Sequence, residues 1–346
     1  MTFLVGSQAW AEDACAPRGE MRFVCGLHQP GDIEVLPGGR QLAVTQMNMS
    51  SSSFGVGWGP GQLTAVNTQD DSLSPLYPRP SAQVKSPVRK GWGDPACPGE
   101  IGTRLSPGGL FLSRRPDGAW QLLVVNHGVR ESIEFFEVIR GDVEWRGCVI
   151  APPSSLLGDV AAIHGGGFAV TNRVDGHRLD IVAHLQDYVA RGKDTGFVYT
   201  WHASHGWRQL PHSEGTLPLG IESDAGGKAI YVAYTGPRGE IRKLDVVTGA
   251  RLATAQNIQA ERLSWDGKRL LATGLDGPYR VNACGRQPGR CPAPFHVTAL
   301  DPMTLAATRV TAQGGGLVEG ATVAVSQGKR LWIGAFLGNR ILSIPR

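Results

Sequence analysis

The sequence predicts an all-β protein, a six-bladed β-propeller with one short lid helix, and three observations support this. The 346 residues include 47 glycines and 23 prolines but only 18% charged residues, a composition typical of many short strands joined by turns. One pattern recurs six times: a small or polar residue, a β-rich run, a turn and a second strand. The recurrences are spaced like blades of about 40–50 residues plus loops. A β-sandwich with coincidental turns is the alternative.

The six recurrences follow one another along most of the chain. They begin at Gly31, Pro107, Gly158, Leu219, Glu261 and Glu319. In a propeller the innermost strand of each blade lines a central channel. We therefore expect the residues that open each recurrence to face the channel axis.

The N-terminal residues 1–11 are predicted to be the residual part of an export signal. They are largely apolar and end in an Ala-x-Ala pattern before Glu12, as a signal-peptide cleavage site does. A disordered N-terminus is the alternative. Residues 12–346 are then expected to form a single propeller domain.

Charge and hydropathy exclude two classes of partner. The formal net charge of +4 is spread along the chain, and the longest basic run is Arg114-Arg115, so nucleic acid is not an expected partner. No stretch approaches the ~20 consecutive apolar residues that a membrane-spanning helix needs. A small organic molecule in the central channel is the expected ligand, and nothing in the sequence indicates an oligomeric state.

Six cysteines predict an oxidising compartment. The expected disulfides are Cys15 with Cys25, Cys97 with Cys148, and Cys284 with Cys291. Six cysteines allow many other connectivities, but the absence of a C-x-x-C motif excludes zinc-ribbon and thioredoxin-like sites. The even count favours a periplasmic or secreted protein.

Residues 122–137 form the most informative stretch of the chain. Residues 122–125 are an apolar run, and the polar pair Asn126-His127 ends it. After a short turn, residues 132–137 begin a second extended run, as in a hairpin. His127 is therefore predicted at a strand end, where its ring can face a pocket.

Residues 177–191 depart from the β pattern. Apolar residues including Ile181, Leu185 and Tyr188 fall on one face of a helix, and Gly192 can cap its end. We expect this helix to lie over one mouth of the channel as a lid. Packing over the rim, without a gating role, is the alternative.

Four stretches of the chain resemble a known family. Residues 30–39, 122–136, 157–161 and 320–334 are similar to the paraoxonase/arylesterase group of calcium-dependent six-bladed propellers, which is akin to the gluconolactonases. This resemblance spans nearly the whole chain. It implies hydrolysis of esters or lactones at a site with two calcium ions, one catalytic and one structural.

The resemblance implies that one structural calcium is retained. Its aspartate ligands match Asp32 and Asp159, and Leu110 matches the residue that supplies a backbone carbonyl. Two carboxylates with carbonyls and waters can meet the six to eight oxygen ligands of calcium. The alternative is that the two aspartates accept hydrogen bonds from turn amides.

The same comparison implies that the catalytic calcium is absent. The family's ligand positions hold Gly31, Gly158, Leu219 and the pair Glu261-Arg262. Glycine and leucine offer no side-chain ligand, and arginine repels a cation. The family's histidine dyad is also incomplete, because one histidine matches His127 and the other position holds Gly108.

Other polar residues at the axis are candidates to replace this chemistry. The predicted catalytic residues are His127, Glu261, Glu319 and Arg262, and the predicted substrate contacts are Trp58, Arg173 and Leu219. A histidine near pKa 6.5 beside a carboxylate can act as a general base, and Arg262 can stabilise an oxyanion. Ion pairing of these groups without catalysis is the alternative.

Three functions remain open from the sequence. The first is an ester or lactone hydrolase with a remodelled, metal-independent site. The second is a non-hydrolytic isomerase or lyase, similar to strictosidine-synthase-like propellers, with Glu319 or Glu261 acting in place of metal. The third is a non-catalytic periplasmic propeller that binds a ligand.

Overall fold

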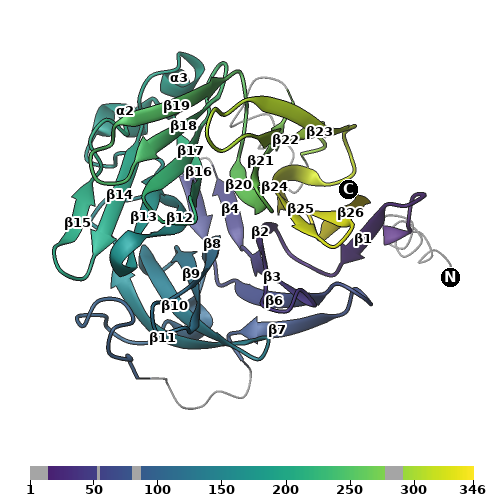
Figure 1. Ribbon diagram of the computed structural model, residues 1–346, viewed down its shortest axis with the longest axis horizontal. Helices are drawn as coiled ribbons and strands as arrows, with labels where there is room; N and C mark the ends of the chain where they lie inside the picture. The colour runs from purple at the N-terminus through teal and green to yellow at the C-terminus, as the bar shows by residue number, and fades with distance from the viewer. Residues whose placement is uncertain (1–14, 53–54, 80–86, 277–290) are drawn as a thin grey trace, which may run out of the picture.

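Six four-stranded sheets form the blades of a β-propeller around a central axis (Figure 1). The computed structural model describes residues 15–52, 55–79, 87–276 and 291–346. The predicted export signal at residues 1–11 therefore lies outside the described residues. No helix among the described residues is long and apolar enough to cross a membrane.

The first three blades are built in chain order from the axis outward. Blade 1 consists of β2 (Pro30–Val35), β3 (Gln41–Gln46), β6 (Gln62–Asn67) and β7 (Leu73–Tyr77). Blade 2 consists of β8 (Pro107–Arg114), β9 (Trp120–Asn126), β10 (Ser132–Ile139) and β11 (Asp142–Ile150). Blade 3 consists of β12 (Leu157–Ile163), β13 (Gly167–Asn172), β14 (Phe197–His202) and β15 (Gly206–Gln209). All neighbouring strands pair antiparallel.

Blades 4 and 5 repeat this order, and blade 6 joins the two ends of the chain. Blade 4 consists of β16 (Pro218–Ser223), β17 (Ala229–Tyr234), β18 (Glu240–Asp245) and β19 (Arg251–Gln256). Blade 5 consists of β20 (Arg262–Asp266), β21 (Arg269–Leu275), β22 (Phe295–Leu300) and β23 (Ala307–Gln313). Blade 6 consists of β24 (Glu319–Gln327), β25 (Arg330–Leu337), β26 (Arg340–Pro345) and β1 (Arg22–Cys25).

The innermost strands confirm the predicted six-fold repeat. β2, β8, β12, β16, β20 and β24 begin within one residue of the six predicted positions, and they converge on the centre of the ring in Figure 1. The ring closes because β1 pairs antiparallel with β26, so that Arg22 lies opposite Ser343. The first and last parts of the described chain thus share one sheet.

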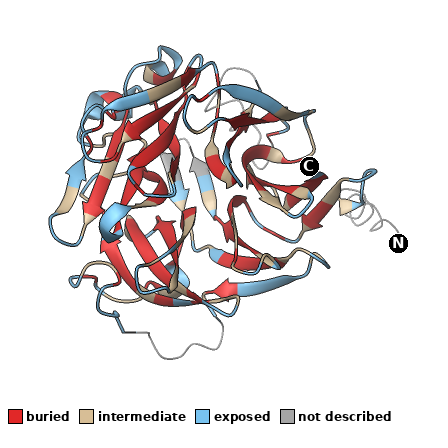
Figure 2. Ribbon diagram, viewed as in Figure 1, coloured by how far each residue is buried: buried red, intermediate tan, exposed pale blue. Residues whose placement is uncertain are grey.

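The core consists of apolar layers between neighbouring blades. Between blades 6 and 1, for example, Val44 packs with Val323 and Trp332, all of which are at most 1% exposed. Figure 2 shows that burial is concentrated on the inner strands and that exposure rises toward the outer edge. Full burial of an aliphatic side chain such as that of Val44 stabilises the fold by about 1.5–3 kcal/mol.

Two disulfides form as predicted, Cys15–Cys25 and Cys97–Cys148. The first joins the residues before β1 to the end of that strand. The second joins the segment before β8 to β11 of the same blade. Cys284 of the third predicted pair lies outside the described residues.

The predicted single lid helix is wrong in two respects. The segment forms two short helices, α2 (Leu179–Ala183) and α3 (Leu185–Ala190), because His184 between them has a non-helical backbone. Ile181 and Val189 pack with Leu217 in an apolar cluster, so the predicted apolar face is largely correct. Figure 1 places both helices toward the outer edge of blades 3 and 4, away from the centre of the ring.

A hairpin inserted in blade 1 lies over the centre instead. Its strands are β4 (Met49–Ser52) and β5 (Gly55–Trp58), and it leaves the blade between β3 and β6. β4 lies close to the meeting point of the inner strands in Figure 1. The described residues also include a single turn of 3-10 helix at Gly102–Arg104 and a short turn at His164–Gly166, in which Gly165 has a non-helical backbone.

Candidate active site

His127 lies directly after β9, at the end of the strand where the sequence predicts it. Its backbone N–H donates to the carbonyl of Ser106 at 2.9 Å, and its side chain is 2% exposed. The Nδ1 atom lies 2.8 Å from Oε1 of Glu131. An ionised carboxylate only accepts hydrogen bonds, so Nδ1 carries the hydrogen and Nε2 is the proton acceptor.

The environment of His127 favours the neutral imidazole. Burial lowers the pKa of His127, and the neighbouring carboxylate of Glu131 opposes this effect. The positive charges of Arg173 and Arg262 lower it further. Nε2 makes no hydrogen bond with any described residue. His127 therefore presents an unprotonated nitrogen near neutral pH, as a general base must.

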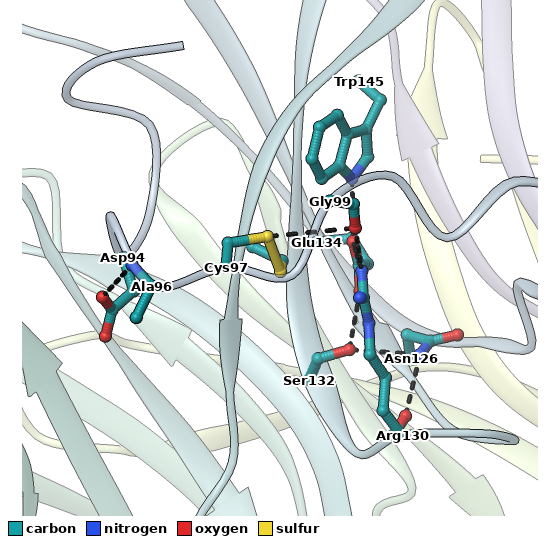
Figure 3. Close-up of a disulfide and its surroundings, with 10 residues drawn as sticks. Asp94, Ala96, Cys97, Gly99, Asn126, Arg130, Ser132, Glu134 and Trp145 are labelled. Carbon is teal, nitrogen blue, oxygen red and sulfur yellow. Dashed lines mark hydrogen bonds and ion pairs between the residues drawn. A yellow bond between two sulfur atoms is a disulfide. The ribbon is translucent and has the colours of Figure 1, made fainter. Parts of the chain in front are cut away.

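The turn that carries this pair is fixed by a buried polar network (Figure 3). Asn126 donates from Nδ2 to the carbonyl of Arg130 at 2.8 Å and accepts from the N–H of Ser106 at 2.9 Å. Arg130 donates to both carboxylate oxygens of Glu134, at 3.0 and 2.9 Å. Glu134 is fully buried and also accepts from the indole N–H of Trp145 at 2.8 Å. These bonds hold the backbone between His127 and Glu131 in one conformation.

The Cys97–Cys148 disulfide adjoins the same network. Arg130 donates from Nη2 to the carbonyl of Gly99 at 3.0 Å, two residues after Cys97 (Figure 3). The disulfide thus anchors the loop that supplies this carbonyl. The positioning of the turn depends on contacts from β10, β11 and the loop before β8.

Trp58 covers the imidazole ring of His127. The two rings are stacked, with centroids 4.0 Å apart and planes inclined by 19°. Trp58 ends β5, so the inserted hairpin brings it over the channel mouth. The Arg173 guanidinium lies on the indole of Trp58, 5.9 Å from its ring centroid. The structure thereby joins three of the predicted site residues, Trp58, His127 and Arg173.

Gly108 provides the space that His127 uses. A Cβ atom at position 108 would lie 2.8 Å from Nε2 of His127, closer than any stable contact allows. A second histidine cannot occupy this position beside the observed His127. Gly108 therefore leaves the room that the observed orientation of the His127 ring requires.

We expect Gly108→Ala to displace His127 and to reduce any activity that depends on it, by about tenfold or more if the ring moves by ~1 Å. The added methyl group occupies the space beside Nε2, so the stack with Trp58 must change. Tryptophan fluorescence and the steady-state rate together check this. Gly166→Ala is a poor control because its φ is +85°, whereas Gly314→Ala is suitable because its Cβ meets open space at an ordinary φ. Unchanged fluorescence and rate in Gly108→Ala would contradict the assignment.

Glu261 is the second titratable group near Arg173. Burial raises the pKa of Glu261 to about 7, although the charges of Arg262 and Arg173 oppose the rise. Its Oε1 atom has no hydrogen-bond partner among the described residues. The carboxyl group is therefore partly protonated at neutral pH and can donate a proton.

The guanidinium of Arg262 is ion-paired with two buried aspartates of other blades. Its Nη1 atom lies 2.8 Å from Oδ1 of Asp159, and its Nε atom lies 3.6 Å from Oδ2 of Asp32. Burial lowers the pKa of Arg262, but the negative charges of Asp159 and Asp32 outweigh this effect, so that the pKa is raised. A guanidinium held in this way is not available to stabilise an oxyanion at His127.

The predicted structural calcium does not fit this arrangement. Calcium binds carboxylate oxygens at about 2.3–2.6 Å, and the Arg262 guanidinium already lies against the oxygens of Asp159. Leu110 contributes its amide N–H to Asp32, at 2.7 Å. Asp32 and Asp159 therefore accept hydrogen bonds from backbone amides, as in the alternative weighed from the sequence. Among the described residues, no group of three or more acidic, histidine or cysteine side chains could hold a metal ion.

Two further carboxyl groups lie on the inner strands of opposite blades. Burial raises the pKa of Glu34 on β2 to about 8, and that of Glu222 on β16 also rises well above its ordinary value. The nearby Asp32 and Asp159 add to both rises, and Glu34 adds to the rise at Glu222. The axis is thus rich in carboxyl groups.

Glu319 and Leu219 are not brought to His127. Glu319 accepts a hydrogen bond from the backbone N–H of Cys291. Leu219 is 8% exposed, and its side chain packs with Val174 and Ile181 beneath α2. Glu319 is the first residue of β24 and Leu219 the second residue of β16, but their side chains pack against neighbouring structure.

Sequence reasoning missed Glu131, the partner of His127. The one available signal was a carboxylate four residues after the histidine in a short hairpin turn. It also missed the buried Arg130–Glu134 pair, because the two residues looked like ordinary members of a turn and an exposed strand position. Their role becomes visible once β10 and β11 are placed side by side.

Comparisons with solved structures support the fold. A gluconolactonase from Xanthomonas campestris has a TM-score of 0.51 at 13% identity, covering 99% of this chain and 93% of its own. A putative gluconolactonase has a TM-score of 0.51 at 14% identity, covering 94% and 91%. A protein of unknown function from Bacteroides thetaiotaomicron has a TM-score of 0.52 at 9% identity, covering 92% and 69%. No protein-family model and no curated protein matches the sequence.

These similarities define the class of fold to which the chain belongs. It is a six-bladed β-propeller of the kind that gluconolactonases adopt. The resemblance inferred from the sequence is thereby confirmed at the level of the fold. At identities of 9–14% a shared fold does not by itself carry a shared reaction.

Proposed function

We propose that the channel mouth hydrolyses esters or lactones without a metal ion, with His127 as the general base. The observation that carries this proposal is the His127–Glu131 pair, in which Nδ1 is held at 2.8 Å and Nε2 has no described partner. A carboxylate that fixes the tautomer of a neutral histidine is a common device for base catalysis. The lactonase-like fold agrees with this reaction class.

The surrounding residues can supply the remaining steps. His127 takes a proton from water at Nε2 as the water oxygen bonds to the carbonyl carbon of the substrate. The positive field of Arg173 favours the oxyanion that forms. When the carbon–oxygen bond to the leaving group breaks, the protonated fraction of Glu261 gives its proton to the departing oxygen. The indole of Trp58, stacked on His127, can contact the apolar part of the substrate with its edge.

The test is a panel of aryl esters and lactones assayed with and without excess EDTA. We expect at least one substrate to be hydrolysed at the same rate in both conditions, since no step requires a metal ion. Inactivation by EDTA with recovery in calcium would contradict the proposed mechanism. The absence of hydrolysis across the panel would contradict the proposed function.

Glu131→Gln is expected to move the acidic limb of the pH–rate profile to lower pH. Glu131 raises the pKa of His127 against the effect of burial, so its removal lowers that pKa further. The rate at the plateau is expected to fall by about tenfold or more, because the amide no longer fixes the tautomer and the histidine is a weaker base. The profile of kcat/KM between pH 4 and pH 9 checks both effects. Glu137→Gln is the control, because Glu137 lies on β10 and pairs with the half-exposed Arg89 instead of with His127. An acidic limb that does not move in Glu131→Gln would contradict the pairing.

A ligand-binding propeller without catalysis is the second candidate. It is favoured by the 2% exposure of His127 beneath Trp58, which restricts access of a substrate to Nε2. A ligand that raises the melting temperature but is never turned over would support this candidate. For either function we propose a periplasmic or secreted location, because the two disulfides are typical of an oxidising compartment.

A further inference from the structure

We propose that Arg262 is a built-in cation at the channel axis that replaces the metal ion expected from the family, so that the fold is stable without divalent cations. This inference is independent of the proposed function. It concerns the junction of the inner strands and not the channel mouth. It rests on three features: the ion-pair geometry, the remaining hydrogen bonds of the two aspartates, and the space provided by a glycine.

The guanidinium lies between carboxylates from two other blades. Arg262 begins β20 of blade 5, whereas Asp159 belongs to β12 of blade 3 and Asp32 to β2 of blade 1. The distances are 2.8 Å from Nη1 to Asp159 and 3.6 Å from Nε to Asp32. The three side chains are 14%, 3% and 5% exposed. A single cation therefore connects three blades where two acidic groups would otherwise repel each other.

Backbone amides also donate hydrogen bonds to both aspartates. Asp32 accepts hydrogen bonds from the amides of Ile33 at 2.9 Å and Leu110 at 2.7 Å. Asp159 accepts from the amides of Val160 at 3.0 Å and Ile221 at 3.1 Å. Leu110 lies on blade 2 and Ile221 on blade 4, so the network reaches five of the six blades. These oxygens would have to give up partners to meet the six to eight ligands that calcium requires.

Gly109 makes room for the ion pair. A Cβ atom at this position would overlap the carboxylate of Asp159 and would lie 2.8 Å from Nη1 of Arg262. Because Gly109 has no side chain, the backbone of β8 can lie close to the guanidinium. Arg262 Nη1 also lies 3.5 Å from the carbonyl oxygen of Gly158. The pocket for the guanidinium is therefore shaped by two inner strands besides the two aspartates.

The decisive experiment compares thermal unfolding of the wild type and of Arg262→Ala in EDTA and in millimolar calcium. The wild type is expected to have the same melting temperature in both conditions and to contain no calcium by metal analysis. Arg262→Ala is expected to melt roughly 5–10 °C lower in EDTA, since it leaves buried carboxylates without a cation. Calcium is expected to restore part of this loss, because the freed carboxylates can then bind it.

Two controls distinguish this effect from general destabilisation. Arg262→Ala combined with Asp159→Asn is expected to show no recovery in calcium, because one carboxylate ligand is gone. Arg269→Ala removes a half-exposed arginine paired with Asp266 in the same blade and is expected to change the melting temperature by less than ~2 °C. Sodium chloride of equal ionic strength should not replace calcium.

Three outcomes would overturn the proposal. The first is a wild type that loses stability in EDTA or carries a bound calcium ion. The second is an Arg262→Ala variant as stable as the wild type. The third is a variant whose stability in EDTA is lowered but does not respond to calcium. If Arg262→Ala does not fold, the wild-type measurements and the more conservative Arg262→Met variant, tested in the same two conditions, decide the question.

Discussion

Replacing Arg130 by methionine is expected to lower the free energy of unfolding by about 3–5 kcal/mol at pH 8. Glu134 is fully buried, and Arg130 is 13% exposed and bonds to both of its carboxylate oxygens. Without the guanidinium, Glu134 keeps the hydroxyl of Ser132 and the indole of Trp145 as partners but has no opposite charge. A buried carboxylate in this state is strongly destabilising.

The cost is expected to be smaller at pH 5 than at pH 8. Burial raises the pKa of Glu134, and Arg130 opposes the rise, so the pKa rises further in Arg130→Met. A carboxyl group whose folded pKa exceeds its unfolded value stabilises the fold at low pH, and this contribution is lost as pH increases. Protonation of Glu134 at pH 5 therefore relieves part of the penalty. Denaturant unfolding at the two pH values measures the difference.

Arg146→Met is the matched control for this prediction. Arg146 pairs with Glu137, also on β10, but there the side chains are 19% and 14% exposed. Its loss is expected to cost no more than about 1 kcal/mol. Adding Glu134→Gln to Arg130→Met should recover much of the stability, because no buried charge remains. Equal costs for Arg130→Met and Arg146→Met would show that the buried pair has no special role.

The sequence predicted the periodic part of the fold and two of the disulfides. The inner strands were found because each begins with a small or polar residue and continues as a short β-rich run, a local pattern. Helical structure occurs within residues 177–191 as predicted, but as two helices and away from the centre of the ring. The break at His184 depends on backbone geometry that the apolar spacing does not encode. The inserted hairpin that carries Trp58 interrupts blade 1 between β3 and β6, so it lies outside the repeated pattern.

The sequence predicted the location of a site residue only where its side chain acts close to its own place in the backbone. His127 follows a buried strand, so its place at the channel mouth could be inferred. Arg262 begins β20, one residue after the predicted start of that repeat, and its long side chain extends to Asp159 and Asp32. The position of a residue in a strand does not determine which partner the end of a long, flexible arginine side chain contacts. Glu131 was missed because its contact with His127 depends on the exact shape of one turn.

His127→Gln is expected to reduce kcat for ester or lactone hydrolysis by about 10²–10⁴-fold with little change in KM. Glutamine fills most of the volume of the ring and preserves contact with Trp58, so binding should be retained. Its amide cannot accept a proton at neutral pH, so water is no longer activated. The rates with the best substrate of the panel, measured at saturation, check the expectation.

Comparison with a surface histidine separates catalysis from general damage. His205 is exposed, and His205→Gln is expected to keep the wild-type rate. His127→Ala leaves a cavity beneath Trp58, and added imidazole is expected to restore part of its activity, which a merely structural histidine would not allow. A His127→Gln variant that folds normally and retains more than about a third of the wild-type kcat would show that proton transfer occurs elsewhere. In that case Glu261, whose pKa lies near 7, becomes the group with the ionisation suited to a general base.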